Sequence, residues 1–119
     1  MKKTLVLGAS LNPSRYSHKA IEKLLGQHIE TVAIGKQEGT VHSLQIKTKL
    51  GEIQNIHTIS LYLNAEKQKQ YYNVIISLQP KRVIFNPGTE NPELYALLKE
   101  HDIYFENSCT LVLLSTGQY

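Results

Sequence analysis

The sequence predicts an α/β fold, in which an open, mainly parallel sheet carries helices on both faces. Short apolar segments alternate with segments of helical spacing along all 119 residues. The first strand, helix and strand fall within residues 3–34, which is the size of one βαβ unit. No internal repeat and no linker interrupts the alternation. We therefore expect one sheet between two layers of helices, with five strands, or six if a short edge strand joins them.

The composition predicts a single globular domain over residues 1–119. Hydrophobic residues make up 41% of the chain and charged residues 19%, which is ordinary for a domain with one core and argues against disorder. The apolar runs are far shorter than the roughly 20 residues that cross a bilayer, and Met1-Lys2-Lys3 leads into a strand without the pattern of a signal peptide. Cys109 is the single cysteine and has no partner for an intrachain disulfide. We expect a cytoplasmic protein that does not enter a membrane.

The charge of the chain favours small anionic ligands over nucleic acid. The formal net charge is +3, and the lysines are dispersed along the chain. Binding to nucleic acid would call for a concentrated basic run, which the sequence lacks. The balance therefore indicates tolerance of anions and no nucleic-acid partner.

The first half of the chain predicts a parallel pair of strands joined by a helix. Lys3–Leu7 and Thr31–Ile34 are apolar runs that suit buried strands. Between them, Ser17–Leu25 carries apolar residues at helical spacing, and Gly26 is placed to end that helix. The polar segment that follows contains one short apolar run, Leu44–Ile46, which is the candidate edge strand.

The second half repeats the alternation. Its expected strands are three further apolar runs: His57–Leu63, Arg82–Phe85 and Ile103–Phe105. Asn64 is a suitable N-cap for a helix over Ala65–Leu78, and Asn91 for a second helix that starts at Pro92. The last apolar segment, Thr110–Leu114, predicts a closing helical turn.

This fold class predicts where a ligand would bind. In open α/β sheets, ligands lie beyond the carboxyl ends of the strands. Segments far apart in the sequence follow those ends and are expected to converge on one edge of the sheet. These segments are Gly8–Arg15, Gly35-Lys36, Leu63-Asn64, Asn86–Glu90 and Asn107–Cys109.

The loop after the first strand suits an anionic group. It enters a helix through small residues, so free backbone N–H groups and the partial positive charge of the helix N-terminus face outward. Arg15 adds a guanidinium that binds phosphate oxygens in a bidentate way. The pattern differs from the G-x-G-x-x-G of dinucleotide-binding enzymes, because Ser10 and Pro13 stand at its later positions. A plain strand-to-helix turn is the alternative interpretation. The candidate binding residues of this loop are Gly8, Ala9, Ser10, Asn12, Pro13 and Arg15.

The end of the second strand points to a phosphorylated ribose. NAD-binding units end this strand with Asp or Glu, which accepts hydrogen bonds from ribose hydroxyls. Here the strand ends at Gly35-Lys36, and a lysine would favour a phosphate on the ribose. A solvated loop lysine is the alternative.

Four stretches of the chain, taken in order, resemble a known family. The chain is similar to the small stand-alone CoA-binding proteins, whose Rossmann-like domain resembles the N-terminal domain of the succinyl-CoA synthetase α subunit. In synthetase-like domains a Gly-Lys pair closes the second strand and a short G-x-x-H follows, as Gly35-Lys36 and Gly39–His42 do here. The resemblance covers nearly the whole length. Its four stretches are Val6–Ser17, Gly35–His42, Phe85–Leu94 and Glu106–Cys109.

The resemblance implies that the ligand is CoA or an acyl-CoA. Gly8, Ser10 and Arg15 fall where the family holds the CoA pyrophosphate, in a loop shaped by Asn12-Pro13. Lys36 falls where the family contacts the phosphorylated ribose, which agrees with its charge.

The resemblance also implies a course for the rest of the ligand. Leu63 lies where the adenine or pantetheine arm would pass. Asn86-Pro87-Gly88 corresponds to the segment facing the pantetheine end, where family members often carry glutamine or tryptophan instead. Cys109 matches a late cysteine of the family, either as a thiol near the sulfur of the ligand or as a small packing residue. His57 departs from the family, which usually has aspartate at this strand start.

Neither a catalytic residue nor a metal site is expected. The histidines are scattered and lack metal-ligand spacing, so we expect them at the surface: His18, His28, His42, His57 and His101. Ser10 lacks the G-x-S-x-G context of a hydrolase nucleophile. The synthetase α subunit uses a phosphorylated histidine from a second domain, for which 119 residues leave no room.

Three interpretations of function remain open on the sequence. The first is a non-catalytic module that binds CoA or an acyl-CoA. The second is a small NADP-dependent or other nucleotide-using enzyme, in which Lys36 would contact the 2′-phosphate. The third is a protein-interaction domain that forms a homo-oligomer through helical tyrosines, namely Tyr71, Tyr72 and Tyr95.

Overall fold

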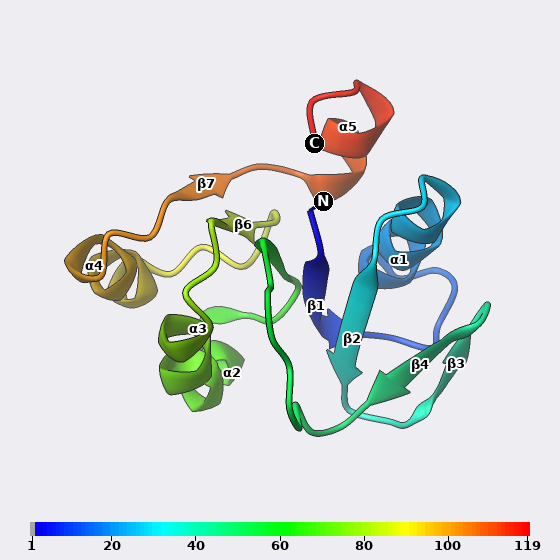
Figure 1. Cartoon of the computed structure of the whole chain (residues 1–119), viewed down its shortest axis with the longest axis horizontal. Coiled ribbons are helices and arrows are strands. Elements are labelled where there is room, and N and C mark those ends of the chain that lie inside the picture. The colour runs from blue at the N-terminus through cyan, green and yellow to red at the C-terminus, as the bar shows by residue number, and fades with distance from the viewer. Residues whose placement is uncertain (1) are drawn as a thin grey trace.

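A computed structural model describes residues 2–119 and has the predicted α/β architecture, with a single sheet of seven strands (Figure 1). The strand order is β3-β4-β2-β1-β5-β6-β7. All neighbours pair in parallel except β3 and β4, which are antiparallel. The strands are β1 Thr4–Ala9, β2 Thr31–Gly35, β3 Gly39–Val41, β4 Leu44–Lys47, β5 Thr58–Leu61, β6 Arg82–Phe85 and β7 Phe105–Asn107.

Helices cover both faces of the sheet, as predicted. One face carries α1 (Tyr16–Gly26) and α5 (Thr110–Ser115). The other face carries a helical segment and a further helix, together with a coil that crosses from β4 to β5. That segment consists of α2 (Ala65–Gln68), the 3-10 turn η1 (Lys69–Tyr71) and α3 (Tyr72–Leu78), and the further helix is α4 (Pro92–Glu100).

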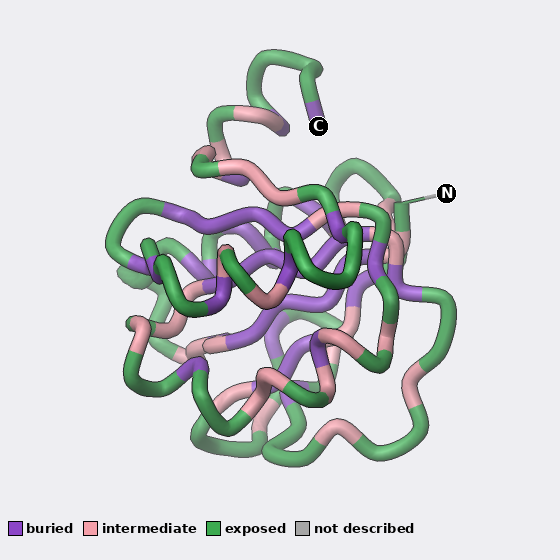
Figure 2. Tube along the Cα trace, turned by 90° about the vertical axis from the view of Figure 1, so that its left-hand side faces the viewer, coloured by how far each residue is buried: buried purple, intermediate pink, exposed green. Residues whose placement is uncertain are grey.

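The alternation of side chains along β1 explains why both faces need cover. Leu5 and Leu7 are fully buried in the cluster that contains α3 and α4. Val6, between them, is fully buried in the cluster that contains α1 and α5. A central parallel strand with two buried faces requires a continuous apolar run, which is the pattern seen in the sequence. Figure 2 shows the buried stretches running through the middle of the molecule.

The two predicted asparagine caps are confirmed. The side-chain oxygen of Asn64 accepts a hydrogen bond from the Lys67 amide at 3.0 Å and begins α2. Asn91 accepts from the amides of Glu93 and Leu94 and begins α4. Each side chain satisfies an amide that has no partner within its helix.

The prediction of five or six strands was too low. The missing strand is β3, which forms a tight hairpin with β4 through His42 and Ser43. Its three residues carry little apolar patterning, so pairing with β4 stabilises it more than strand propensity does. The hairpin extends the sheet beyond β2 and adds an edge strand of opposite direction.

Several predicted boundaries also shift, including the end of the first strand, which reaches Ala9. The helix expected over residues 65–78 is divided by the η1 turn. The break follows Gln68, which is fully buried and donates to the carbonyl oxygens of Leu63 and Thr89, each at 2.8 Å. The strand expected over 57–63 is limited to β5, and the last strand begins at Phe105 because Ile103 packs into the core before the pairing starts.

Candidate functional site

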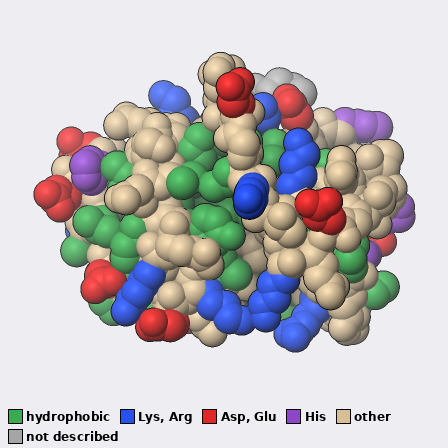
Figure 3. Space-filling model, turned by 90° about the horizontal axis from the view of Figure 1, so that it is seen from below, with side chains coloured by type: hydrophobic (Ala, Val, Ile, Leu, Met, Phe, Trp, Pro, Cys, Tyr) green, Lys and Arg blue, Asp and Glu red, His purple; other side chains and the backbone are tan. Residues whose placement is uncertain are grey.

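A cleft of about 1200 Å³ lies at the carboxyl edge of the sheet, where the sequence predicts the ligand site. The β1–α1 loop, the end of β2, the two residues after β5 and the α2–η1 segment form its walls. The strands β1 and β2 run downward to this edge in Figure 1, and Figure 3 views the molecule from that side. The volume exceeds the roughly 300–1,000 Å³ of common small-molecule pockets and suits a long ligand.

The loop after β1 is braced by its own polar side chains. Ser10 Oγ accepts a hydrogen bond from the Asn12 amide at 3.1 Å. Asn12 Oδ1 accepts from the amide of Ser14 at 3.0 Å and from its hydroxyl at 2.8 Å. The Arg15 amide then donates to the carbonyl oxygen of Asn12 at 3.0 Å as α1 begins. These bonds fix the loop around the start of α1, which has no side-chain cap and no acidic residue in its first turn.

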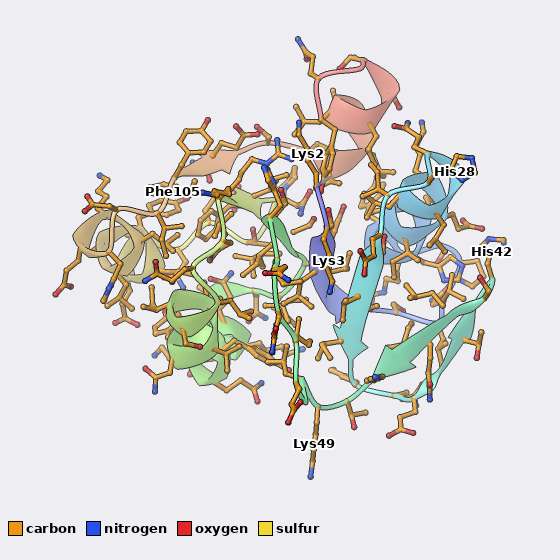
Figure 4. The ribbon with its side chains drawn as sticks, in the orientation of Figure 1. Lys2, Lys3, His28, His42, Lys49 and Phe105 are labelled. Atoms are coloured by element: carbon orange, nitrogen blue, oxygen red, sulfur yellow. The ribbon has the colours of Figure 1, made fainter. Side chains whose placement is uncertain are left out.

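His18 stabilises this loop through a hydrogen bond, and the sequence did not predict this role. Its Nδ1 lies 3.0 Å from the carbonyl oxygen of Ser10, and the residue is only 8% exposed. The expectation of a surface histidine is wrong at this position, because His18 lies on the buried face of α1 beside Ser17. His28 and His42 are exposed, as expected, and Figure 4 shows them on the outer side of α1 and at the β3–β4 hairpin.

Two glycines allow the backbone at the cleft to pack closely. Gly8 has φ of +97°, and a Cβ there would lie 2.9 Å from the backbone of Tyr62. A Cβ at Gly35 would collide with the carbonyl oxygen of Ala9. The ends of β1, β2 and β5 thus approach one another so closely that the backbone itself forms part of the cleft surface.

The cleft carries three cations and no acidic side chain among the lining residues of the described chain. The cations are Arg15, Lys36 and Lys67, and they come from three separate elements. The pKa of Lys67 lies below its ordinary value, first because of a side-chain hydrogen bond from Lys36 and then because of repulsion from Lys36. Ion pairs within residues 2–119 engage other cations, namely Lys3, His42 and Lys69. The cleft is therefore a region of uncompensated positive charge.

In Figure 3, which views this edge of the sheet, Lys and Arg side chains gather along the lower part of the molecule, near hydrophobic and a few acidic side chains. The apolar and aromatic part of the cleft lining comprises Leu11, Tyr16, Ile34, Tyr62, Leu63, Tyr71 and Pro87. A surface that combines cations with apolar groups suits a ligand that has both phosphates and an uncharged arm.

Lys67 is the second functional candidate that the sequence did not identify. A signal for it was present, because Asn64 caps the helix and so places the next residues at the carboxyl edge.

The structure brings most of the predicted site residues to the cleft lining. These are Gly8, Ala9, Ser10, Asn12, Arg15, Gly35, Lys36, Leu63 and Pro87. Four predicted residues lie outside that lining: Pro13, Asn86, Gly88 and Cys109. Pro13 and Gly88 are exposed, and Cys109 is half-buried immediately before α5.

Asn86 is a structural bracket, by which we mean a buried side chain whose hydrogen bonds connect several elements. It is almost fully buried, and its Nδ2 donates to Ser60 Oγ at 2.9 Å and to the Leu61 carbonyl oxygen at 2.8 Å. Its Oδ1 accepts from the amide of Thr110 at 2.8 Å, which satisfies the start of α5. The side chain therefore ties β5, β6 and α5 together with its polar atoms already engaged.

Tyr62 lines the cleft, but its hydroxyl is buried. This hydroxyl forms no well-aligned hydrogen bond among the described residues. The hydroxyls of Ser60 and Thr110 lie nearby and pair with each other at 2.8 Å. Burial raises the pKa of Tyr62 to about 12. The hydroxyl thus stays protonated at neutral pH and cannot act there as a general base.

The titratable and metal-ligating groups of the cleft are few. Its titratable lining side chains, within residues 2–119, are the three cations and three tyrosines, namely Tyr16, Tyr62 and Tyr71. Over the same residues, no group of three His, Cys, Asp or Glu side chains is arranged to hold a metal ion. None of the helices in this part of the chain combines the length and apolar character needed to cross a membrane.

Comparison with known proteins assigns this architecture to a family. Residues 2–115 match the model of a family described as a CoA binding domain. A crystal structure of an uncharacterized protein has 44% sequence identity and a TM-score of 0.95, covering 100% of this chain and 98% of its own. Proteins from Thermus thermophilus and Pyrococcus horikoshii OT3 each have 20% identity and a TM-score of 0.86. They cover 99% and 97% of this chain, and 90% and 82% of their own chains. At that identity they show the fold alone. A search of the curated proteins finds no match.

Proposed function

This chain belongs to the CoA-binding domain family, and from that premise we propose that it binds CoA or an acyl-CoA in the carboxyl-edge cleft as a non-catalytic module. The observation that carries the proposal is the positive charge of the cleft, where Arg15, Lys36 and Lys67 meet without an acidic side chain. CoA carries a pyrophosphate and a separate phosphate on the ribose, so its charge complements three cations.

The β1–α1 loop would hold the pyrophosphate. Its backbone is braced by Ser10 and Asn12, and α1 begins behind it without a side-chain cap. An anion at this place would meet the positive end of α1 and the guanidinium of Arg15. Gly8 lets the end of β1 pack against the residues after β5, since a Cβ there would lie 2.9 Å from the Tyr62 backbone.

The phosphorylated ribose would lie toward Lys36. This residue directly follows β2, which is the position that distinguishes ribose hydroxyls from a ribose phosphate in related nucleotide sites. Gly35 supports the placement, because its close approach to Ala9 draws the end of β2 against the loop. Lys36 is thereby held near the same anionic ligand that the loop binds.

The uncharged arm of the ligand would run along the apolar side of the cleft. Leu63, Tyr71 and Pro87 line this side, and the lining also includes Tyr62. The proposal contains no reaction step, since the lining of the cleft, within the described residues, offers no histidine, cysteine or carboxylate for acid–base or nucleophilic work.

Calorimetric titration with CoA, 3′-dephospho-CoA, NAD and NADP tests the proposal. We expect CoA to bind, and to bind more tightly than 3′-dephospho-CoA. The variants Arg15→Ala and Lys36→Ala should each weaken CoA binding about tenfold, because each removes a charge-assisted contact to phosphate. Retention of full CoA affinity in both variants would show that the assigned site is wrong.

The same titration addresses the enzyme alternative. Binding of NADP with indifference to CoA would overturn the module proposal and favour a nucleotide-using enzyme. A hydride-transfer assay with reduced nicotinamide cofactor and a panel of small carbonyl compounds would then follow. We expect no cofactor oxidation in that assay.

A further inference from the structure

We propose that Lys36 and Lys67 form a paired-ammonium receptor for one phosphomonoester dianion, and that Lys67 selects ligands bearing this group over identical ligands with a free hydroxyl. The inference rests on the proposed function for its natural ligand, since the 3′-phosphate of CoA is a phosphomonoester. It goes further by assigning specificity to a residue outside the loop and the second strand.

The strand order brings the two lysines together from opposite sides. Lys36 follows β2, and Lys67 lies in the helical segment that follows β5. Both strands pair with β1, one on each side, so the carboxyl end of β1 and its loop lie between the two lysines. Both side chains line the same cleft, and the presence of Lys36 lowers the pKa of Lys67.

Two neighbouring ammonium groups without an acid destabilise each other. The pKa of Lys67 is lowered, chiefly by Lys36 and to a smaller extent by Arg15. Lys69, two residues further along, provides a contrast, because it pairs with Glu66 at 3.3 Å and its pKa is raised by that carboxylate. The same short segment thus holds one lysine with an acidic partner and one facing a like charge, and a bound anion would relieve that repulsion.

The charge pattern favours a monoester over a diester. A phosphomonoester carries close to two negative charges at neutral pH and three strong acceptor oxygens on one phosphorus. Two ammonium groups with three donors each can share those oxygens. The phosphate groups of a pyrophosphate diester carry one charge each, and the β1–α1 loop with its single guanidinium is the better match for them.

The Lys67 side chain contributes little to the structure, so a substitution that removes its charge should leave the fold intact. Its side chain is exposed, and its backbone amide makes the capping bond to Asn64. Substitution with methionine keeps the length of the aliphatic chain and the helical propensity while removing the charge. Lys69→Met is the matched control, because Lys69 is also exposed and lies in the same segment.

The test is calorimetric titration of the wild type, Lys67→Met and Lys69→Met with CoA and with 3′-dephospho-CoA. We expect Lys67→Met to lose about tenfold in affinity for CoA and little for 3′-dephospho-CoA, so that the preference for the phosphorylated ligand collapses. Lys69→Met should keep the wild-type preference. An equal loss for both ligands, or no loss for either, would overturn the inference while leaving CoA binding itself established.

Proton linkage gives a second readout that a structural role would not change. A dianion beside Lys67 raises the pKa of this lysine, so binding should take up protons as the pH of the measurement rises toward 10.5. Titrations in two buffers of different ionisation enthalpy measure that uptake. We expect clearly less uptake in Lys67→Met than in the wild type and in Lys69→Met, because Lys36 alone then faces the dianion, and equal uptake in all three would contradict the inference.

Failure of the proposed function would be distinguishable from failure of this inference. If the wild type does not bind CoA, the same titrations are made with NAD and NADP in place of 3′-dephospho-CoA and CoA. NAD and NADP also differ by one phosphomonoester, the 2′-phosphate. A preference for NADP that disappears in Lys67→Met would support the receptor and overturn the CoA assignment. No binding of any of the four ligands would overturn both.

Discussion

His18 Nδ1 lies 3.0 Å from the carbonyl oxygen of Ser10, and this contact joins the first turns of α1 to the loop that begins the candidate site. The histidine is buried, so the bond is shielded from water and from competition. The loop is therefore held both by its own polar side chains and by the helix that follows it.

His18→Ala should loosen this loop. Loss of a buried hydrogen bond and of imidazole packing is expected to lower the free energy of unfolding by about 1–3 kcal/mol, measured by urea denaturation. His18→Asn places an amide nitrogen near the position of Nδ1 and should recover part of the loss. Equal destabilisation by both variants would mean that packing, and not the bond to Ser10, matters at this position.

Gly35→Ala should be strongly destabilising. The added Cβ would collide with the Ala9 carbonyl oxygen, which is backbone and cannot move aside without separating β1 from β2. We expect a loss of several kcal/mol, about the upper range for single substitutions, or a failure to fold. Gly26→Ala is the control, since no atom lies within 4 Å of a Cβ there, and its unfolding midpoint should remain close to that of the wild type or rise. A stable Gly35→Ala protein would argue against the close approach of the two strands.

The sequence predicted those elements whose signals are local. Asn64 and Asn91 announce helix starts because a cap satisfies amides only a few residues away. The loop around Ser10 and the lysine after β2 could be placed at the cleft because the segments that follow parallel strands meet at the carboxyl edge. These signals sufficed for the fold class and for two of the three cations of the cleft, Arg15 and Lys36.

The features that the sequence did not predict depend on contacts between distant segments. The strand β3 exists because it pairs with β4 and because Gly39 allows Leu11 to pack against it. Lys67 joins Lys36 only because β2 and β5 flank β1, and strand order cannot be read from periodicity. Asn86 lies in a polar loop pattern that suggests a ligand contact, yet the fold buries it as a bracket.

Asn86→Ala should destabilise the fold more than it affects ligand choice. It would leave the Thr110 amide without its side-chain acceptor and the Leu61 carbonyl oxygen without its side-chain donor. We expect a loss of about 2–4 kcal/mol in the free energy of unfolding, because several buried hydrogen bonds disappear at once. Pro87→Ala, at an exposed neighbour that lines the cleft, serves as the comparison. If folded Asn86→Ala protein lost its preference for CoA over 3′-dephospho-CoA, a purely structural role of Asn86 would not explain the result.

Tyr62 should make the protein sensitive to alkaline pH. Its pKa is raised to about 12 by burial, whereas an unfolded chain would release the phenolic proton near 10. Between these values the unfolded state binds fewer protons than the folded state, so stability falls as the pH rises. The contribution is intact below pH 10, and about 2–3 kcal/mol is lost by pH 12.

Tyr62→Phe removes this titration and separates it from that of the other tyrosines. Near neutral pH we expect the variant to be as stable as the wild type or slightly more stable, because the buried hydroxyl has no hydrogen-bond partner to lose. Urea denaturation of both proteins between pH 8 and 11 should show the difference in unfolding free energy shifting further toward the variant above pH 10. A constant difference across that range would mean that the phenol ionises normally and that its hydroxyl reaches solvent. That outcome would assign Tyr62 to the open surface of the cleft, where its hydroxyl could meet a bound ligand directly.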